Sequence, residues 1–206
     1  MRFMELKEAF KDYTLFSIQE IRKIDASFHR RRLNEWQSKG YIKKIIRGYY
    51  MFSDIEMNEH VLFEIANRIH QPSYVSLEMA LSYYHLIPES VYSITSITTK
   101  RPHKYQTDLG EFTYRYVKPS LFFGYRLITY QQNKTFKIGY PEKVIVDFLY
   151  LNPHIESYDD FKSLRINITS FKEQIHDKKI FRFAEIVGQK RLMQTMRRFM
   201  EYMTHA

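Results

Sequence analysis

The chain has 206 residues, of which 44% are hydrophobic and 17% aromatic, and it carries a formal net charge of +9. This composition supports a folded core and excludes a disordered chain, and the absence of cysteine excludes disulfides and thiolate metal sites. The first residues are charged and amphipathic, unlike a signal peptide, and no apolar run approaches the roughly 20 residues that cross a bilayer, so we expect a cytoplasmic protein with no membrane segment.

The positive charge is concentrated near the N-terminus. Residues 1–52 contain twelve Lys and Arg but six Asp and Glu, so a quarter of the chain carries two-thirds of the net charge. A basic segment favours the phosphates of nucleic acid or an anionic membrane surface as partners. The alternative is a solvated helix face, which accounts for many runs of charge.

Two short helices are predicted at the start of the chain. Apolar residues recur at helical spacing in residues 3–10, and the pattern is interrupted at residues 14–16. Ser17 then precedes a second apolar stripe, with Glu20 three residues further on, which is the signature of a capping box. A short break at residues 25–27 separates this second helix from a third.

The third predicted helix combines an apolar face with a polar one. His29, Leu33 and Trp36 share one face, which we expect to pack on the core, and Gly40 ends the helix. Two β-rich runs follow, on either side of a two-residue turn that contains glycine, and they predict a β-hairpin.

Three helices and a hairpin in this order are typical of a winged helix-turn-helix, so we predict a DNA-binding domain over residues 1–55. The polar side of the third helix suits the major groove, because Arg can bond to guanine and Asn to adenine, while basic residues of the hairpin can hold phosphates. We expect Arg32, near the edge of the core, to extend along the surface or to contact phosphate. The predicted DNA-binding residues are Ser27, Arg30, Arg31, Arg32, Asn34, Lys43, Lys44 and Arg47. The alternative is a winged helix that contacts a protein.

Residues 56–206 predict a second domain, of mixed α/β structure with an antiparallel-rich sheet and a helical C-terminal segment, so the fold class of the chain is α+β. Pro141 is expected to open a helix at its favoured first position. Strands are predicted at residue 74 and near 91–99, 111–117, 121–130 and 134–139, and helices near 59–70, 76–86, 141–151, 158–165, 169–177, 180–187 and 189–203.

The second predicted domain contains no catalytic motif. It has no phosphate-binding loop, no zinc-protease motif and no nucleophile elbow, and its histidines lack ligand spacing, so we expect no enzyme activity, no metal and no cofactor. Glu142, Lys143 and Asp147 are interpreted as helix-capping and surface residues.

A second basic stretch lies at residues 98–104. Its hydroxyl and basic side chains make it a second candidate for contact with nucleic acid, and the alternative is an ordinary exposed loop. The residues concerned are Thr99, Lys100, Arg101 and Lys104. A nucleic-acid-processing enzyme or an RNA-binding protein, with its site in residues 91–147, is therefore the alternative function.

The order of several motifs resembles the antitoxin of AbiE abortive-infection systems, a type IV class of toxin–antitoxin system. The resemblance covers about residues 15–151 and rests on RGYYMF, YVSLEMALSYYHLIPE, ITSITTKRPHKYQTDLGEFTYRYV, FFGY and YPEKVIVDFLYL. It implies a winged-helix part that represses its own operon, and a second domain that counters a nucleotidyltransferase-like toxin, generally without binding it directly. We therefore expect a transcriptional autorepressor that binds double-stranded operator DNA. The sequence leaves open whether a toxin gene is adjacent and whether the protein is a homodimer.

Overall fold

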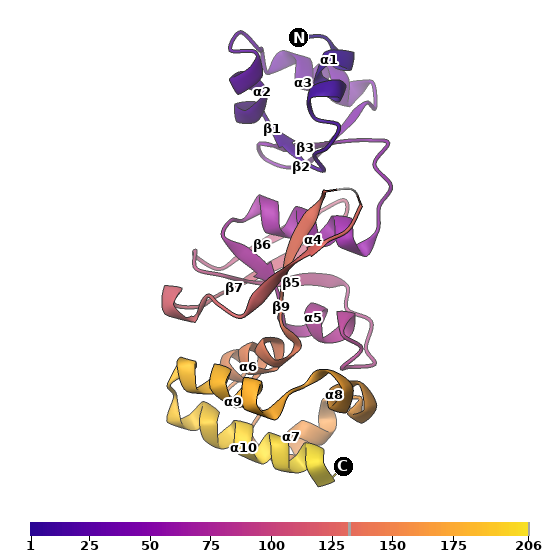
Figure 1. The fold of residues 1–206 in the computed structure, drawn as a ribbon. Helices are drawn as coiled ribbons and strands as arrows, with labels where there is room; N and C mark the ends of the chain where they lie inside the picture. The colour runs from indigo at the N-terminus through magenta and orange to yellow at the C-terminus, as the bar shows by residue number, and fades with distance from the viewer. Residues whose placement is uncertain (132, 206) are drawn as a thin grey trace.

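The computed structural model describes residues 1–131 and 133–205 as an elongated molecule with the two termini at opposite ends (Figure 1). Helices and strands are both present, as expected for an α+β protein. Residues 1–55, here called the N-terminal segment, contain α1 (Phe3–Ala9), β1 (Phe16–Ser17), α2 (Ile18–Ile24), α3 (Arg31–Ser38), β2 (Ile42–Ile46) and β3 (Tyr49–Phe52).

The local signals in the N-terminal segment act as the sequence predicts. The Ser17 hydroxyl accepts a hydrogen bond from the Glu20 amide, and the Glu20 carboxylate accepts one from the Ser17 amide, which confirms the capping box. Gly40 and Gly48 have φ angles of +72° and +95°, a left-handed conformation that ends α3 in one case and closes the β2–β3 hairpin in the other. Strand β1 was not predicted, because two residues are too few to show a strand pattern.

Three antiparallel strands in the order β1-β3-β2 form the sheet of the N-terminal segment. The three helices cover it with an apolar cluster, in which the Trp36 ring lies 5.7 Å from that of Phe3 and 5.6 Å from that of Phe28. The buried members of this N-terminal cluster are Leu6, Phe10, Phe16, Ile21, Phe28, Leu33, Trp36, Ile42, Tyr50 and Phe52.

The rest of the chain is built on a six-stranded mixed sheet with helices on both faces. The strand order is β6-β7-β5-β4-β9-β8, and two of the five pairings, β4 with β9 and β5 with β7, are parallel. The elements are α4 (Glu59–Ile69), β4 (Ser73–Val75), α5 (Leu77–Tyr83), β5 (Ser93–Thr98), β6 (His103–Thr107), β7 (Gly110–Tyr116), the 3-10 turn η1 (Pro119–Leu121), β8 (Tyr125–Thr129), β9 (Thr135–Gly139), α6 (Pro141–Leu151), α7 (Tyr158–Ser163), α8 (Ile168–Gln174), α9 (Asp177–Val187) and α10 (Lys190–His205).

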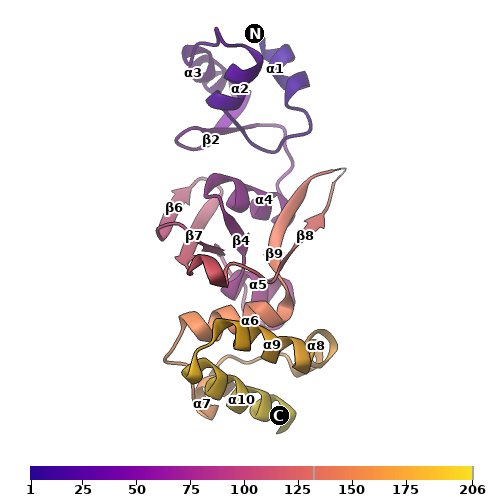
Figure 2. The ribbon, with the colours of Figure 1, turned by 60° about the vertical axis from the view of Figure 1, so that its left-hand side comes forward.

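Helix α4 lies between the sheet and the N-terminal segment, whereas α6 lies at the opposite side of the sheet, with α7 to α10 beyond it (Figures 1 and 2). The helical C-terminal segment is thus confirmed. In the described part of the chain, no helix combines the length and the apolar character that crossing a membrane requires.

The β2–β3 hairpin belongs to two cores at once. Ile42 and Tyr50 pack in the N-terminal cluster, whereas Ile45 and Met51 pack in the larger core around the six-stranded sheet. Neighbouring residues of a strand point to opposite faces, so one hairpin can contact both. The hairpin therefore ties the N-terminal segment to the sheet.

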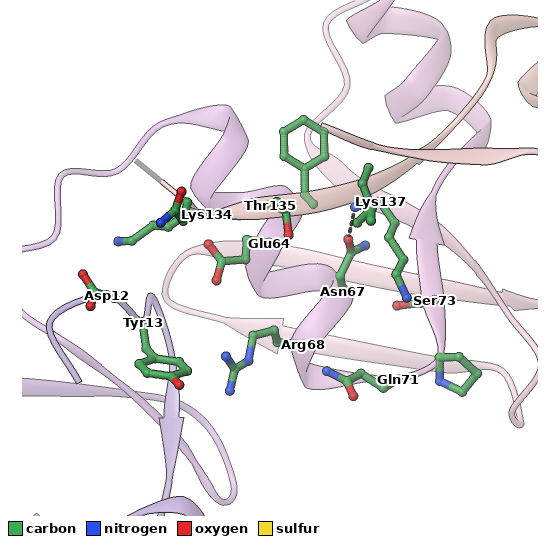
Figure 3. Close-up of a pocket in the computed structure, with 14 residues that line it drawn as sticks. Asp12, Tyr13, Glu64, Asn67, Arg68, Gln71, Ser73, Lys134, Thr135 and Lys137 are labelled. Carbon is green, nitrogen blue, oxygen red and sulfur yellow. Dashed lines mark hydrogen bonds between the residues drawn. The ribbon is translucent and has the colours of Figure 1, made fainter. Parts of the chain in front are cut away.

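Polar contacts reinforce this junction. The Glu64 carboxylate on α4 is buried and accepts hydrogen bonds from the hydroxyls of Thr14, at 2.6 Å, and Tyr130, at 2.5 Å. Arg68, one turn further along α4 (Figure 3), forms an ion pair with Glu20 of α2 at 2.7 Å. These contacts join the N-terminal segment to both α4 and the β8–β9 hairpin.

Candidate nucleic-acid interface

Helix α3 presents two of the predicted base-contacting residues to solvent. Leu33 and Trp36 are buried, whereas Arg31 and Asn34 are exposed. Within the described residues, neither Arg31 nor Asn34 makes a side-chain hydrogen bond or ion pair. An open hollow on this surface is lined by His29, Arg31, Arg32, Asn34, Glu35 and Ser38.

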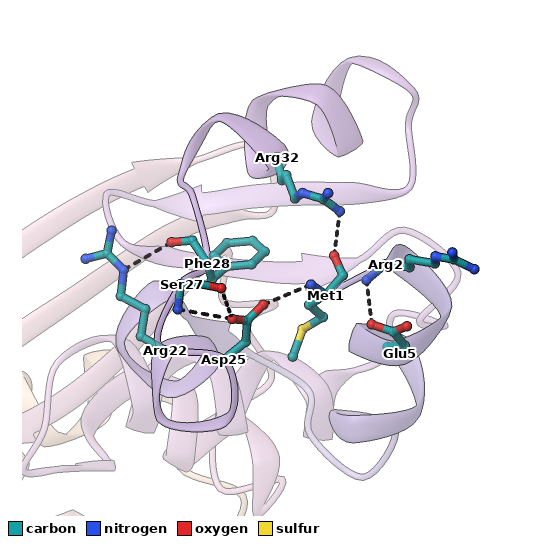
Figure 4. Close-up of polar contacts among 8 residues, drawn as sticks. All are labelled: Met1, Arg2, Glu5, Arg22, Asp25, Ser27, Phe28 and Arg32. Atoms are coloured by element: carbon teal, nitrogen blue, oxygen red, sulfur yellow. Dashed lines mark hydrogen bonds and ion pairs between the residues drawn. The ribbon is translucent and has the colours of Figure 1, made fainter.

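Two predicted residues occupy positions other than those expected (Figure 4). Helix α3 begins at Arg31, so Ser27 lies in the preceding turn, where its hydroxyl donates to Asp25 Oδ1 at 2.6 Å. Arg32 is exposed, but its Nη1 donates to the carbonyl of Met1 at 2.6 Å. Both side chains therefore already have a partner within the chain.

The turn between α2 and α3 is organised around Asp25. The Ser27 hydroxyl and the Met1 ammonium, 2.9 Å from Asp25 Oδ2, lower the pKa of the Asp25 carboxyl to about 2. His29 was expected on the core face and is instead exposed, because it lies before the helix and Phe28 fills the core position. Arg30, which directly precedes α3, is also exposed.

The basic residues of the hairpin are exposed. Lys43 pairs with Met51 and Lys44 with Tyr50, so the two lysines leave opposite faces of the hairpin, and a bulge follows Lys44. Near the turn, the hairpin faces the β6–β7 turn across a groove. The residues that line this groove are Lys44, Ile45, Ile46, Arg47, Gln106, Thr107 and Asp108.

The second basic stretch is partly a strand and not a loop. β6 begins at His103 and pairs with β7, and Lys104 forms an ion pair with Glu111 across the two strands at 2.6 Å. Lys100 and Arg101 are exposed in the turn before β6, and Thr99 is half-buried. Strand β6 contacts β2 (Figure 2), and the part of it that faces the hairpin across the groove is its last residues and the turn that follows.

The hairpin connects the basic regions of the chain. Helix α3 contacts β2, and β2 contacts β6, the strand that contains the end of the second basic stretch. The second stretch is distant from α3 in the sequence, and the packing of the hairpin against the larger sheet relates the two regions in space. Exposed positive charges attract anionic groups.

A buried polar network was missed by the sequence interpretation. Lys143 and Asp147, expected at the surface, are buried at the centre of α6 and form an ion pair. The Tyr74 and Ser76 hydroxyls donate to Asp147 Oδ2 at 2.8 and 3.0 Å, and Lys143 Nζ donates to the Tyr74 hydroxyl at 3.1 Å. Burial raises the pKa of Asp147, and the Lys143 ammonium opposes that rise.

Glu142 was also expected at the surface and is buried as well, with its carboxylate 3.0 Å from the Lys179 ammonium of α9. The signal for the network was the four-residue spacing of Lys143 and Asp147, which places both on one face of an otherwise apolar helix. All three side chains are buried and paired within the fold and do not line an open site. In the part of the chain that the structure describes, no group of three or more Asp, Glu or His is arranged to hold a metal ion.

Comparison with protein-family models finds no match, and a search of curated proteins finds none either. The resemblance to AbiE antitoxins therefore rests on the sequence motifs alone.

Proposed function

We propose that the chain is a transcriptional autorepressor of the AbiE antitoxin type, that it binds double-stranded operator DNA through residues 1–55, and that it is not an enzyme. In this proposal the N-terminal segment is a winged helix-turn-helix domain and residues 56–206 form the antitoxin domain. Such a regulator acts in the cytoplasm, and a nucleotidyltransferase-like toxin, where one is encoded nearby, is countered without direct binding.

The observation that carries the proposal is the two-sided character of α3. Its buried side, Leu33 and Trp36, anchors the helix, while Arg31 and Asn34 lie exposed and unpaired among the described residues. These two side-chain types make bidentate contacts with guanine and adenine in the major groove. The element order, from α1 through β3, and the three-stranded sheet support the same assignment.

Alanine variants separate base contacts from phosphate contacts. Arg31→Ala or Asn34→Ala should cost about 1–3 kcal/mol on a duplex taken from upstream of the protein's own gene and little on a random duplex. Lys44→Ala or Arg47→Ala should weaken binding to both duplexes about equally and lower the salt slope by about one. Lys172→Ala, an exposed residue of α8 at the far end of the molecule, is the matched control.

Fluorescence anisotropy at several salt concentrations measures the affinity of each variant for the two duplexes and its dependence on salt. With about six phosphate contacts, affinity should fall by about 10³-fold between roughly 50 and 200 mM salt. Equal losses on both duplexes for the Arg31 and Lys44 variants would show that α3 does not contact bases. Binding that does not depend on salt, or no duplex binding at low salt, would refute the proposal.

The alternative function is an enzyme acting on nucleic acid or an RNA-binding protein with its site in residues 91–147. Its acid–base candidates, Glu142, Lys143 and Asp147, are buried and paired. RNA binding keeps one supporting observation, the exposure of Lys100 and Arg101 in the turn before β6. A single-stranded RNA of the same length, added to the anisotropy series, tests it: preference for RNA that is lost in Arg101→Ala would favour this alternative.

A further inference from the structure

A polar cleft of about 380 Å³ lies at the junction between the N-terminal segment and the six-stranded sheet (Figure 3). One wall comes from α4, the turn before β4 and the start of β9, and the other from residues before β1. This volume lies in the range of sites for small molecules and is too small for a macromolecular partner. The lining residues used below are Asp12, Tyr13, Glu64, Asn67, Arg68 and Lys137.

Two hydrogen-bond donors of this cleft are buried without a partner. Asn67 is 9% exposed, and its Oδ1 accepts from the Lys137 amide at 2.5 Å. The Asn67 Nδ2 has no hydrogen-bond partner in the described part of the chain, and the same is true of Arg68 Nε. Because leaving a buried donor unpaired costs free energy, such groups normally find an acceptor.

Of the three basic residues that line the cleft, Arg68 is paired with Glu20, and the two lysines have no carboxylate partner among the described residues. These lysines are Lys134 and Lys137. The Lys137 side chain extends past Asn67 toward Ser73 (Figure 3). An ammonium group and an amide donor are thus placed at the same end of the cleft.

The acidic groups near the cleft already have partners or lie at its edge. Glu64 Oε2 accepts from Thr14 and Tyr130, and Glu20 pairs with Arg68 Nη2. Asp12 is exposed. The unfilled positions of the cleft are therefore donors, which call for a ligand that brings acceptor oxygens.

We propose that this cleft binds a small molecule through an oxyanion group, a phosphate or a carboxylate, held by Asn67 Nδ2 and the Lys137 ammonium, which lie at the same end of the cleft. A charge-assisted hydrogen bond such as that from the Lys137 ammonium is one of the stronger kinds. Since Tyr13 and Asp12 form the opposite wall, the ligand contacts both the N-terminal segment and the sheet. The site is distinct from the exposed face of α3.

Isothermal titration calorimetry of the full chain with inorganic phosphate, adenosine monophosphate and citrate tests the proposal. We expect saturable binding of one probe per chain, and the tighter class, phosphate or carboxylate, identifies the group. Asn67→Asp keeps the acceptor for the Lys137 amide but replaces the free donor by a negative oxygen, so affinity should fall at least tenfold. Lys137→Gln, which keeps most of the side-chain length, should also weaken binding about tenfold.

Lys172→Gln, far from the cleft, should bind as the unchanged protein does, and circular dichroism establishes that each variant is folded. If Asn67→Asp does not fold, Lys137→Gln alone decides, because its side chain is only half-buried. The proposal is overturned if none of the three probes binds saturably, or if binding survives in Lys137→Gln and is lost in Arg31→Ala. No DNA enters this experiment, so its failure is separate from a failure of the proposed function.

Discussion

The N-terminal segment and the larger part of the chain use their charged residues in opposite ways. In residues 1–55 the buried polar residue is Thr14, whose hydroxyl points to Glu64 in the other part, and the basic side chains of α3 and the hairpin are exposed. The larger part instead buries Glu64, Glu142, Lys143 and Asp147. No charged residue of the first region is buried, whereas the second region buries these four and leaves most of its other charged residues exposed or half-buried.

Exposed and buried charges contribute differently to the stability of the fold. Exposed charges contribute little to stability, because water and salt screen them, and they remain available to a partner. Buried charges must be fully paired, because desolvation costs several kcal/mol for each ion. The comparison teaches that the excess of positive charge in residues 1–52 remains open to solvent, where the proposed function would use it, whereas the charges of α6 lie inside the fold.

The largest effect is expected at the buried pair of α6. Asp147→Ala should lower the free energy of unfolding by about 3–5 kcal/mol, because it leaves the Lys143 ammonium buried without a counter-charge. Urea denaturation followed by far-UV circular dichroism measures the change. The double variant Lys143→Met, Asp147→Leu should recover much of the loss, since it removes both charges and keeps the volume. A cost below about 1 kcal/mol for Asp147→Ala would show that the site opens to water.

In the apolar core of the N-terminal segment, the free energy of unfolding should depend on the side-chain volume that a substitution removes. Trp36→Ala removes a ring that is 4% exposed and should cost about 3 kcal/mol, at the low end for such a change because the cluster is small and close to the surface. Trp36→Phe should cost less, because its ring keeps contact with Phe3 and Phe28. Thermal melting compares the two variants, and equal losses would argue against packing of the indole as the cause.

The junction decides whether the two regions unfold together. Glu64→Ala should cost about 1–3 kcal/mol, because the Thr14 and Tyr130 hydroxyls lose their acceptor. Trp36 is the sole tryptophan, so its fluorescence reports on the N-terminal segment while circular dichroism reports on the whole chain.

The two signals should coincide in the unchanged protein and separate in Glu64→Ala. Glu64→Gln keeps one acceptor oxygen and should separate them less. Signals that are already separate in the unchanged protein would show that the shared hairpin does not couple the two regions.

The smallest effect concerns acid stability of the turn between α2 and α3. The folded pKa of Asp25, about 2, lies below the ordinary value of 3.8, so its contribution to stability is present above about pH 4 and is lost as the pH falls toward 2. Asp25→Asn should therefore flatten the dependence of the melting temperature on pH between these values. Ser27→Ala removes the larger cause of the shift and should reproduce part of the flattening; an unchanged slope in both variants would contradict the assignment.

The sequence by itself determined the elements whose signals are local. The capping box at Ser17, the left-handed glycines at positions 40 and 48, and Pro141 at the start of α6 each act within a few residues. The helices of the C-terminal segment were predicted for the same reason, because an apolar stripe repeats over several turns. The exposure of Arg31 and Asn34 also followed from periodicity alone.

Only the tertiary structure decided the rest. Strands β1 and β6 are short or polar, and they exist because neighbouring strands supply their hydrogen bonds. From the sequence alone, Lys143 and Asp147 are expected at the surface, because charged residues are costly to bury. Tyr74 and Ser76, about 70 positions earlier in the chain, supply hydrogen bonds that offset this cost. The cleft at Asn67 likewise depends on residues from both ends of the junction. Contacts between distant parts of a chain leave no local pattern, and for that reason the junction and the buried network could not be predicted.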